Sequence, residues 1–305
     1  MQRQSLSLVL TVFLMVFLFP HLSFAHGVVG KRLFVEPMAT EDANVFSEYD
    51  LVVPSYLRGE EGKELSLGTS LSLQLTERLG LEVAGEWTAL NPNEGESEKG
   101  FQNPELALKY VAYTSPVHEW IATAALSVEL PVGEENVGAE NFYSIGTGFF
   151  YGKGFGDLPD SLKYLQPLMV QGDATIHQNL TSETEAIANT LSYDFAIYYS
   201  LPYLQQFVKD VGIPAPFNRL FPMVELNFNR VLNGPDVGQT EAFARPGFVW
   251  VGKASQVGLA AVLPINGTTR KTADLGVMGI VSLYLDDLFP KQFRRPIFAS
   301  EEMKK

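Results

Sequence analysis

The sequence predicts an all-β fold: an antiparallel, up-and-down transmembrane β-barrel of about twelve strands. Three features indicate this fold, namely segments of about ten residues with alternating apolar and polar side chains, an N-terminal export signal and few charged residues. Alternation with a period of two is typical of a strand that has one apolar and one polar face. Charged residues make up 19% of the chain, below the quarter that is usual in soluble domains.

The first 25 residues have the features of a secretory signal peptide. Arg3 precedes an apolar run from Leu6 to Phe19, and Ser23-Phe24-Ala25 forms a small-x-small cleavage site. We therefore expect residues 1–25 to be removed. Residues 26–44 show no sustained periodicity, and we expect an irregular N-terminal segment there.

Residues 64–90 show the alternation most clearly, as the two arms of a hairpin. Every second residue from Leu65 to Leu75 is leucine or threonine, with small or polar residues between them, and the pattern resumes after a turn at Glu77 and Arg78. Each arm has about the 9–11 residues that a tilted strand needs to cross a bilayer. On this hairpin alone, a soluble sandwich or lipocalin-like barrel with a leucine core is the alternative.

The other strands follow the same pattern. We predict them at about residues 45–57, 104–114, 119–131, 142–152, 168–178, 191–201, 222–231, 241–252, 256–264 and 273–285. With the two arms of the hairpin the total is twelve, and an even number returns both ends of the barrel to one side of the membrane. The predicted barrel spans residues 45–286, and a periplasmic tail follows at 287–305.

The connections between these strands fall into two kinds. Polar loops alternate with tight turns, except that 153–167 and 202–222 are long and contain helical patterns at 161–165 and 203–211. Long outer loops and short periplasmic turns are typical of outer-membrane barrels, whereas a soluble sandwich has no reason to sort its loops. The sequence therefore favours the bacterial outer membrane, with outer-membrane lipid around the barrel. The two long connections are candidates for docking a periplasmic partner.

Composition excludes several classes of function. Without the signal peptide, 21 basic and 35 acidic residues give a net charge of −14, which makes nucleic acid a poor partner. The chain has no cysteine, so disulfides and thiolate chemistry are excluded. The sequence has no zinc spacing, phosphate loop or calcium loop, and we expect no cofactor and no metal.

Candidate catalytic residues are few. His177 is predicted to face the lumen near Thr175 and Asp173, but the chain has no His-x-Ser pair of the kind that outer-membrane phospholipases place on one strand. We therefore predict that the protein is not an enzyme. A lipid-modifying barrel that uses His177 is the weaker alternative.

Charged side chains on the predicted inner face are mainly acidic. The predicted lumen-lining residues are Glu82, Glu86, Glu105, Lys109, Glu129, Asp173, His177, Asp194, Glu225, Arg245 and Asp274. Charged rings in a pore set its preference among ions and solutes, so this set predicts a water-filled path that disfavours anions. Alternatively, these groups pair across a plugged interior and only stabilise the barrel.

Five segments of the chain are distinctive: HGVVGKR (26–32), LVVPSY (51–56), GFQNPELALKY (100–110), SPVHEW (115–120) and YGKGFGDLPDSLKYLQPL (151–168). They resemble a family of uncharacterised bacterial outer-membrane proteins that are grouped with the barrels of the MetA pathway of phenol degradation. The resemblance implies an outer-membrane barrel, sometimes described as a transporter, without assigned substrate or catalytic residues. One departure is the twenty residues after Leu285, because such barrels often end on an aromatic residue of the last strand.

Together these observations predict a passive channel or transporter for small solutes, including hydrophobic or aromatic ones. A non-conducting barrel with a structural or partner-binding role is the main alternative.

Overall fold

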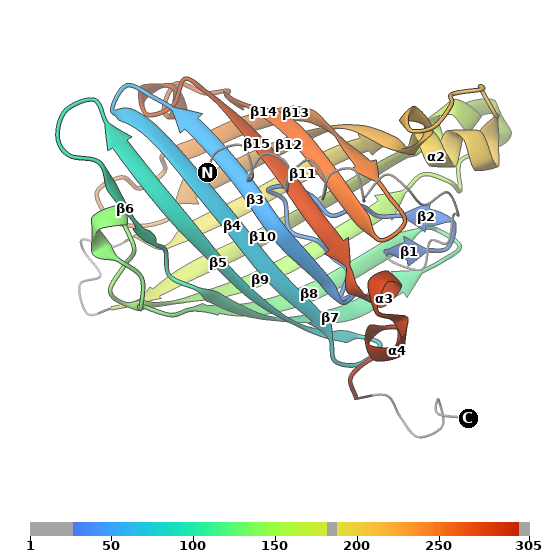
Figure 1. Ribbon diagram of the computed structural model, residues 1–305, viewed down its shortest axis with the longest axis horizontal. Coiled ribbons are helices and arrows are strands. Elements are labelled where there is room, and N and C mark those ends of the chain that lie inside the picture. Colours follow the sequence, from blue (N-terminus) through green and yellow to red (C-terminus); the bar gives the residue numbers. More distant parts are fainter. Residues whose placement is uncertain (1–26, 182–187, 299–305) are drawn as a thin grey trace, which may run out of the picture.

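The protein folds into a closed antiparallel barrel, seen in a computed structural model that describes residues 27–181 and 188–298 (Figure 1). The predicted signal peptide at 1–25 and the end of the tail lie outside the described residues. The wall is built from β3 (Glu48–Arg58), β4 (Gly62–Gln74), β5 (Leu79–Pro92), β7 (Glu105–Ser115), β8 (Trp120–Glu129), β9 (Tyr143–Gly154), β10 (Leu168–Leu180), β11 (Thr190–Tyr199), β12 (Leu220–Val231), β13 (Thr240–Val251), β14 (Ser255–Pro264) and β15 (Leu275–Tyr284).

The sheet closes because β3 pairs with both β4 and β15, and β5 pairs with both β4 and β7. A closed ring leaves no edge strand, which matters in a lipid core that offers no water to unpaired backbone groups. The short strand β6 (Glu98–Phe101) pairs with β5 near its end and extends one side of the barrel beyond the ring (Figure 1). The prediction of a barrel with twelve strands is confirmed.

The alternation of side chains also distinguishes the outer face of the wall from its inner face. Leu65 and Leu67 are 40% and 37% exposed on the outside, whereas Ser66 between them is 6% exposed. Other strands present the same outer belt, which includes Leu108, Leu126, Phe149, Phe195, Ile197, Phe248, Leu259 and Val277. A contiguous belt of this kind suits a hydrocarbon environment, and the leucine row of the hairpin is not the core of a soluble sandwich.

The two ends of the barrel differ. At the loop end, the described parts of the connections after β3, β5, β8, β12 and β14 contain β6, η1 (Glu135–Val137) and η5 (Thr269–Lys271). At the turn end lie η2 (Asp160–Leu165), α2 (Leu201–Tyr203), η3 (Leu204–Val208), η4 (Phe217–Arg219), α3 (Leu285–Leu288) and α4 (Pro290–Phe293). Within the described ranges, no helix has the length and apolar character needed to cross a membrane.

Some boundaries differ from the prediction. The predicted helix at 203–211 instead begins at Leu201 and ends at Val208. The first wall strand begins at Glu48, three residues later than predicted, because the preceding residues turn into the barrel. A small hairpin, β1 (Val28–Val29) and β2 (Arg32–Leu33), lies at the turn end within the segment predicted to be irregular (Figure 1).

The outer belt generates a first prediction. Leu259 lies in the middle of β14 and is 49% exposed, so a Leu259→Arg substitution places a charge near the bilayer midplane. Such a charge costs about 2–4 kcal/mol on the lipid face of a barrel. We expect a smaller folded fraction in phospholipid vesicles, measured as the heat-sensitive band on a gel. A Val237→Arg variant in an exposed loop is the control, and equal folded fractions of the two variants would contradict a lipid-facing belt.

Candidate functional site

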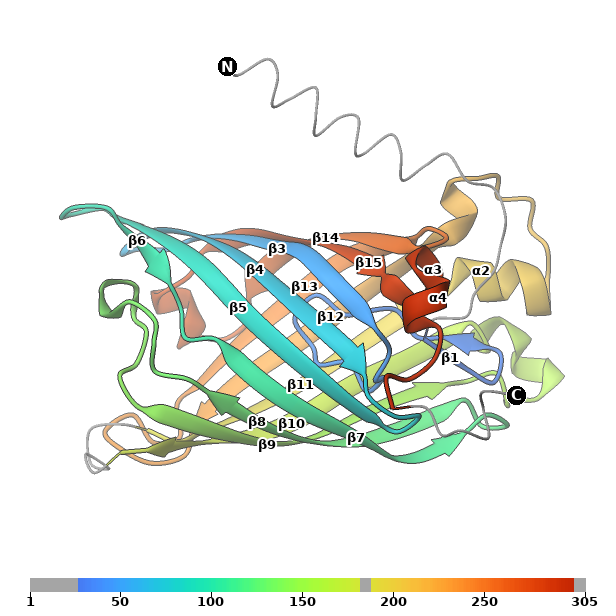
Figure 2. The same cartoon turned by 60° about the horizontal axis from the view of Figure 1, so that its bottom comes forward.

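A segment of the chain fills part of the barrel interior. Residues 34–47, here called the plug, run from β2 into the barrel and back to the start of β3 (Figure 2). Phe34, Val35, Met38 and Ala43 are buried there against inward side chains of the wall. The interior is therefore occupied by backbone that forms no strand of the wall.

Glu225 on β12 is the central contact of the plug. Its carboxylate accepts hydrogen bonds from the backbone N–H groups of Met38 (2.9 Å), Ala39 (2.9 Å) and Thr40 (3.1 Å). The hydroxyl of Tyr198 donates a further bond at 3.3 Å, and Glu225 is 0% exposed. Hydrogen bonds to a carboxylate are stronger than those between neutral groups, so they compensate for burying this charge.

Other wall side chains bind the plug backbone as a neighbouring strand would. Gln256 accepts from the N–H of Glu36 and donates to its carbonyl, at 3.1 and 2.8 Å. Gln171 donates to the carbonyl of Val35 at 2.8 Å, and Asp173 accepts from the N–H of Glu41 at 2.9 Å. These contacts come from β10 and β14 as well as β12, so the plug is held from several sides of the barrel.

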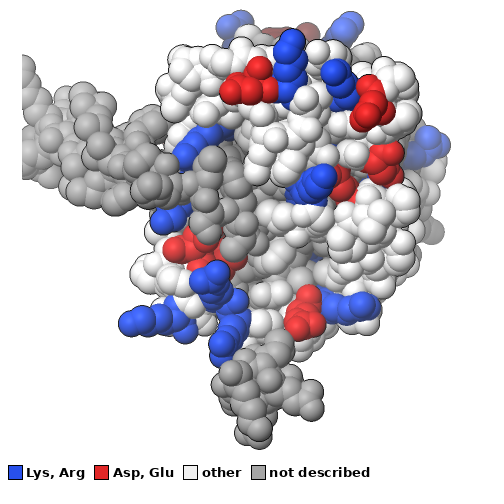
Figure 3. Space-filling model, turned by 90° about the vertical axis from the view of Figure 1, so that its right-hand side faces the viewer, with Lys and Arg blue, Asp and Glu red and all other residues white. Residues whose placement is uncertain are grey.

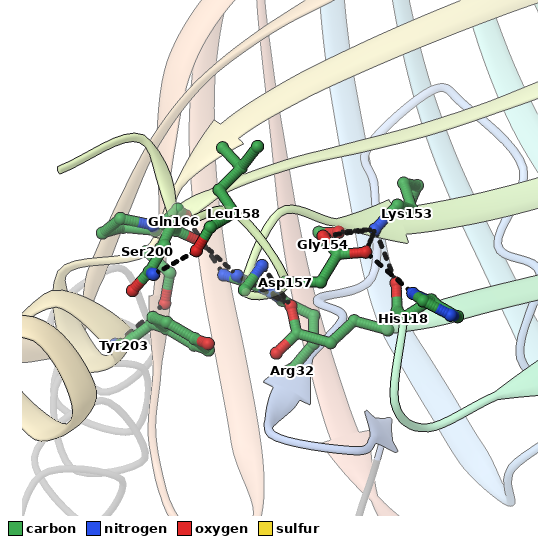
Figure 4. Close-up of polar contacts among 12 residues, drawn as sticks. Arg32, His118, Lys153, Gly154, Asp157, Leu158, Gln166, Ser200 and Tyr203 are labelled. Carbon is green, nitrogen blue, oxygen red and sulfur yellow. Dashed lines mark hydrogen bonds and ion pairs between the residues drawn. The ribbon is translucent and has the colours of Figure 1, made fainter. Parts of the chain in front are cut away.

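The chain is anchored at the turn end just before the plug. Arg32 is 0% exposed and pairs with Glu119 at 3.0 Å, and it donates to the carbonyls of Gln166 and Pro167 (Figure 4). Its guanidinium also lies 3.9 Å from the ring centroid of Tyr203. Burial lowers the pKa of Arg32 and the charge of Glu119 opposes that shift. One buried base therefore joins the N-terminal segment to both helix-bearing connections.

A second, more exposed cluster lies beside this anchor. Asp157 accepts from Lys153 at 3.0 and 3.1 Å, and its carboxylate is 3.0 Å from Nδ1 of His118 (Figure 4). Burial raises the pKa of Asp157, but the hydrogen bonds from His118 and Lys153 outweigh it and hold the pKa below its ordinary value. This cluster fixes the turn before β8 against the connection after β9.

Two cavities, here called the vestibule, lie on the loop side of the plug. They measure about 360 and 180 Å³, and Ala39, Glu41 and Glu105 line both. The larger one is open rather than enclosed. Gly146 and Gly148 line the smaller one, where an added Cβ would lie within 2.7 Å of neighbouring side chains. The absence of side chains on these glycines keeps that space open.

The structure brings most of the predicted lumen residues together. Glu82, Glu86, Glu105 and Lys109 line the larger cavity, and Asp173, His177 and Asp194 join Glu105 around the smaller one. Lys109 is buried and pairs with Glu82 at 2.7 Å and with Glu41 at 3.4 Å. This lysine therefore links the wall to the plug.

The remaining predicted residues lie elsewhere. Glu225 binds the backbone of the plug. Its cross-strand neighbour Arg245 donates a hydrogen bond to Asn227. Glu129 accepts from Asn103 at 3.0 Å near the loop end of β8. Asp274 is in the connection before β15, half-exposed and 3.9 Å from Arg58, so it lies at the rim and outside the vestibule.

The sequence analysis did not identify the plug or its partners Arg32, Glu119, Gln171 and Gln256. Their contacts join residues more than 80 positions apart, and no local pattern encodes such pairs. One feature of the sequence could have indicated the plug. This stretch shows no alternation but still contains the apolar residues Phe34, Val35 and Met38.

Comparison with known proteins places this fold. No family model matches the sequence, and no curated protein matches it. The solved structures that it resembles include the COG4313 outer membrane channel from Pseudomonas putida F1, at 15% identity and a TM-score of 0.50, covering 82% of this chain and 99% of the channel. They also include the KdgM porin, at 12% identity and a TM-score of 0.45, covering 78% and 98%.

One sequence-based prediction needs correction. The matched structures include the outer membrane phospholipase A from Escherichia coli, at 11% identity and a TM-score of 0.41, covering 80% of this chain and 91% of the phospholipase. The prediction that the chain is not an enzyme was therefore wrong, because the solved barrels that match this chain include an enzyme as well as channels. What is established is the fold, a closed antiparallel barrel of twelve strands like that of the outer membrane channel.

Proposed function

We propose that the protein is a passive outer-membrane channel for small solutes, in which the plug is a gate. The observation that carries the proposal is that the plug is attached to the lumen mainly by side chains. The wall is held by backbone ladders between all neighbouring strands, whereas Glu225, Gln171, Gln256 and Asp173 provide much of the plug's polar attachment. The plug can therefore move without breaking the barrel.

The energetics of displacement support this role. Without replacement by water, an amide hydrogen bond is worth about 4–6 kcal/mol, whereas its net contribution after exchange with water is about 1.5–3 kcal/mol when one partner is charged. If the plug moves away, water can enter the lumen and solvate both the carboxylate and the freed N–H groups. The net cost of opening is then much smaller than the sum of the broken bonds, and a minor open population is physically accessible.

The vestibule supports a preference for small cationic or neutral polar solutes. The larger cavity is lined by the acidic residues Asp50, Glu82, Glu86 and Glu105. Lys109 is the base among them, and it already pairs with Glu82. A negative field concentrates cations and repels anions. Apolar or aromatic solutes are the second class, and the apolar patch of Met38, Val53, Met278 and Ile280 on the same cavity favours them.

A Glu225→Gln substitution tests the gate. Glutamine keeps the size of the side chain but removes the charge that accepts three backbone N–H bonds, so we expect the open population to rise roughly ten- to hundred-fold. The measurement is ion current through the purified protein in a planar bilayer. Glu241→Gln, on the neighbouring strand and exposed, is the matched control. Equal currents from both variants would refute a gate held by Glu225.

A second test addresses selectivity. In the Glu225→Gln background, replacing Glu86 and Glu105 by glutamine removes two negative charges from the vestibule. We expect the ratio of cation to anion permeability to fall, which the reversal potential across a potassium chloride gradient reports. Asp160→Asn removes a charge at the turn end, outside the vestibule, and an equal fall in that variant would contradict selection by the vestibule.

A non-conducting barrel that docks an acidic periplasmic protein is the second candidate function. The turn-end connections 153–167 and 202–222 expose Leu162, Leu165 and Phe217, and lysine and arginine side chains lie on this end of the molecule among a smaller number of acidic ones (Figure 3). Complementary charge and exposed apolar groups are typical of interfaces. The absence of current from the Glu225→Gln variant and from the unmodified protein alike would favour this candidate over the channel.

A further inference from the structure

Three carboxylates meet where the plug joins the wall. Glu36 and Asp42 come from the plug, and Glu48 is the first residue of β3. One carboxylate oxygen from each residue lies within 4.8 Å of the others. Asp42 and Glu48 are buried, whereas Glu36 is partly buried and also lines the larger cavity of the vestibule.

This concentration of charge requires neutralisation. Neither Glu36 nor Asp42 forms an ion pair with a base among the described residues, and the buried Lys109 is engaged by Glu41 and Glu82. Like charges within 5 Å in a medium of low dielectric constant cannot all remain ionised without a counter-charge. For Glu36 and Asp42, protons or a cation can supply it.

Unpaired oxygen atoms at the cluster favour a cation. The Oε2 atom of Glu36 is enclosed and has no hydrogen-bond partner. Asn44 is 6% exposed, and its Nδ2 donates to Asp42 at 2.8 Å, while its own Oδ1 is also enclosed and unpartnered. Buried polar atoms without partners are rare in folded proteins and often indicate an ion or water that binds there.

We propose that Glu36, Asp42 and Glu48, with the side-chain carbonyl of Asn44, bind one Ca²⁺ ion. All four donors are oxygen atoms, and calcium binds carboxylates together with amide carbonyls at about 2.3–2.6 Å. The separation of the three carboxylate oxygens fits within an oxygen shell of that radius. The sequence contains no calcium-binding loop, and the plug assembles this site from residues that are not consecutive.

The ion would tie the plug to the barrel. It joins two points of the plug, at 36 and 42, to the first residue of a wall strand. Removing it leaves three negative charges that repel one another, which favours displacement of the plug. This consequence rests on the proposed gate, whereas binding of the ion does not.

Calorimetric titration with calcium chloride at pH 7.5 tests the site. The purified chain is refolded in detergent free of lipopolysaccharide, because lipopolysaccharide binds calcium itself. We expect saturable binding of one ion and at least a ten-fold loss of affinity in Glu36→Gln. This variant is decisive because the Oε2 atom of Glu36 has no hydrogen bond to lose. Asp42→Asn is the second variant, and each must keep the heat-dependent gel shift of a folded barrel.

Glu60→Gln combined with Glu61→Gln, in the exposed loop after β3, is the control for general loss of acidic charge, and we expect it to bind calcium normally. Absence of saturable binding would mean that protons alone neutralise the cluster and would overturn the proposal. Unchanged affinity in Glu36→Gln would overturn it as well. Calorimetry requires no current, so a protein that binds calcium but does not conduct would refute the channel and leave the calcium site standing.

Discussion

The structure depends on one constraint: backbone N–H and C=O groups at membrane depth must find partners inside the protein. The twelve wall strands meet it through a closed ladder. The plug cannot, because it forms no strand with the wall. Its backbone is satisfied by inward side chains instead, and Glu225, Gln171 and Gln256 act as substitutes for a neighbouring strand.

This constraint separates the acidic residues of the lumen into two groups. Glu225 faces backbone donors, and its charge is tolerated at 0% exposure because three N–H groups point toward it. Glu86 and Glu105 line the vestibule instead, where the cavity leaves room for water. Acidic residues on the same face of the same barrel therefore have different physical roles, depending on whether the plug covers them.

The sequence was sufficient to predict the wall because its information is local. A period of two places Leu65 and Ser66 on opposite faces without reference to any other strand, and loop lengths order the connections. It also placed Glu105, Asp173 and Asp194 on the inner face, where the structure gathers them around cavities. Asp274 was predicted in the lumen but lies at the rim, because the last strand begins one residue after it.

The plug could not be predicted in this way. Its backbone follows no period, and many of its contacts join it to residues more than 100 positions away, as those with Gln171 and Gln256 do. A local pattern shows that Glu225 faces inward, but only the folded chain shows whether it meets water or three N–H groups. Burial of the plug is a property of the whole barrel, which must exist before the segment has anything to bind.

The way in which the plug is tethered restricts how it can move. Arg32 holds its N-terminal side at the turn end, and its C-terminal side continues into β3 through Glu48. A segment fixed at both ends cannot leave the barrel as a unit, so an opening must be a local rearrangement of the residues between the two anchors. Because the tethers keep the plug close to Glu225, its effective concentration there is high and it rebinds quickly. In the proposed gate, this favours the closed state at rest, and the anchor at Arg32 contributes to closure together with the contacts inside the lumen.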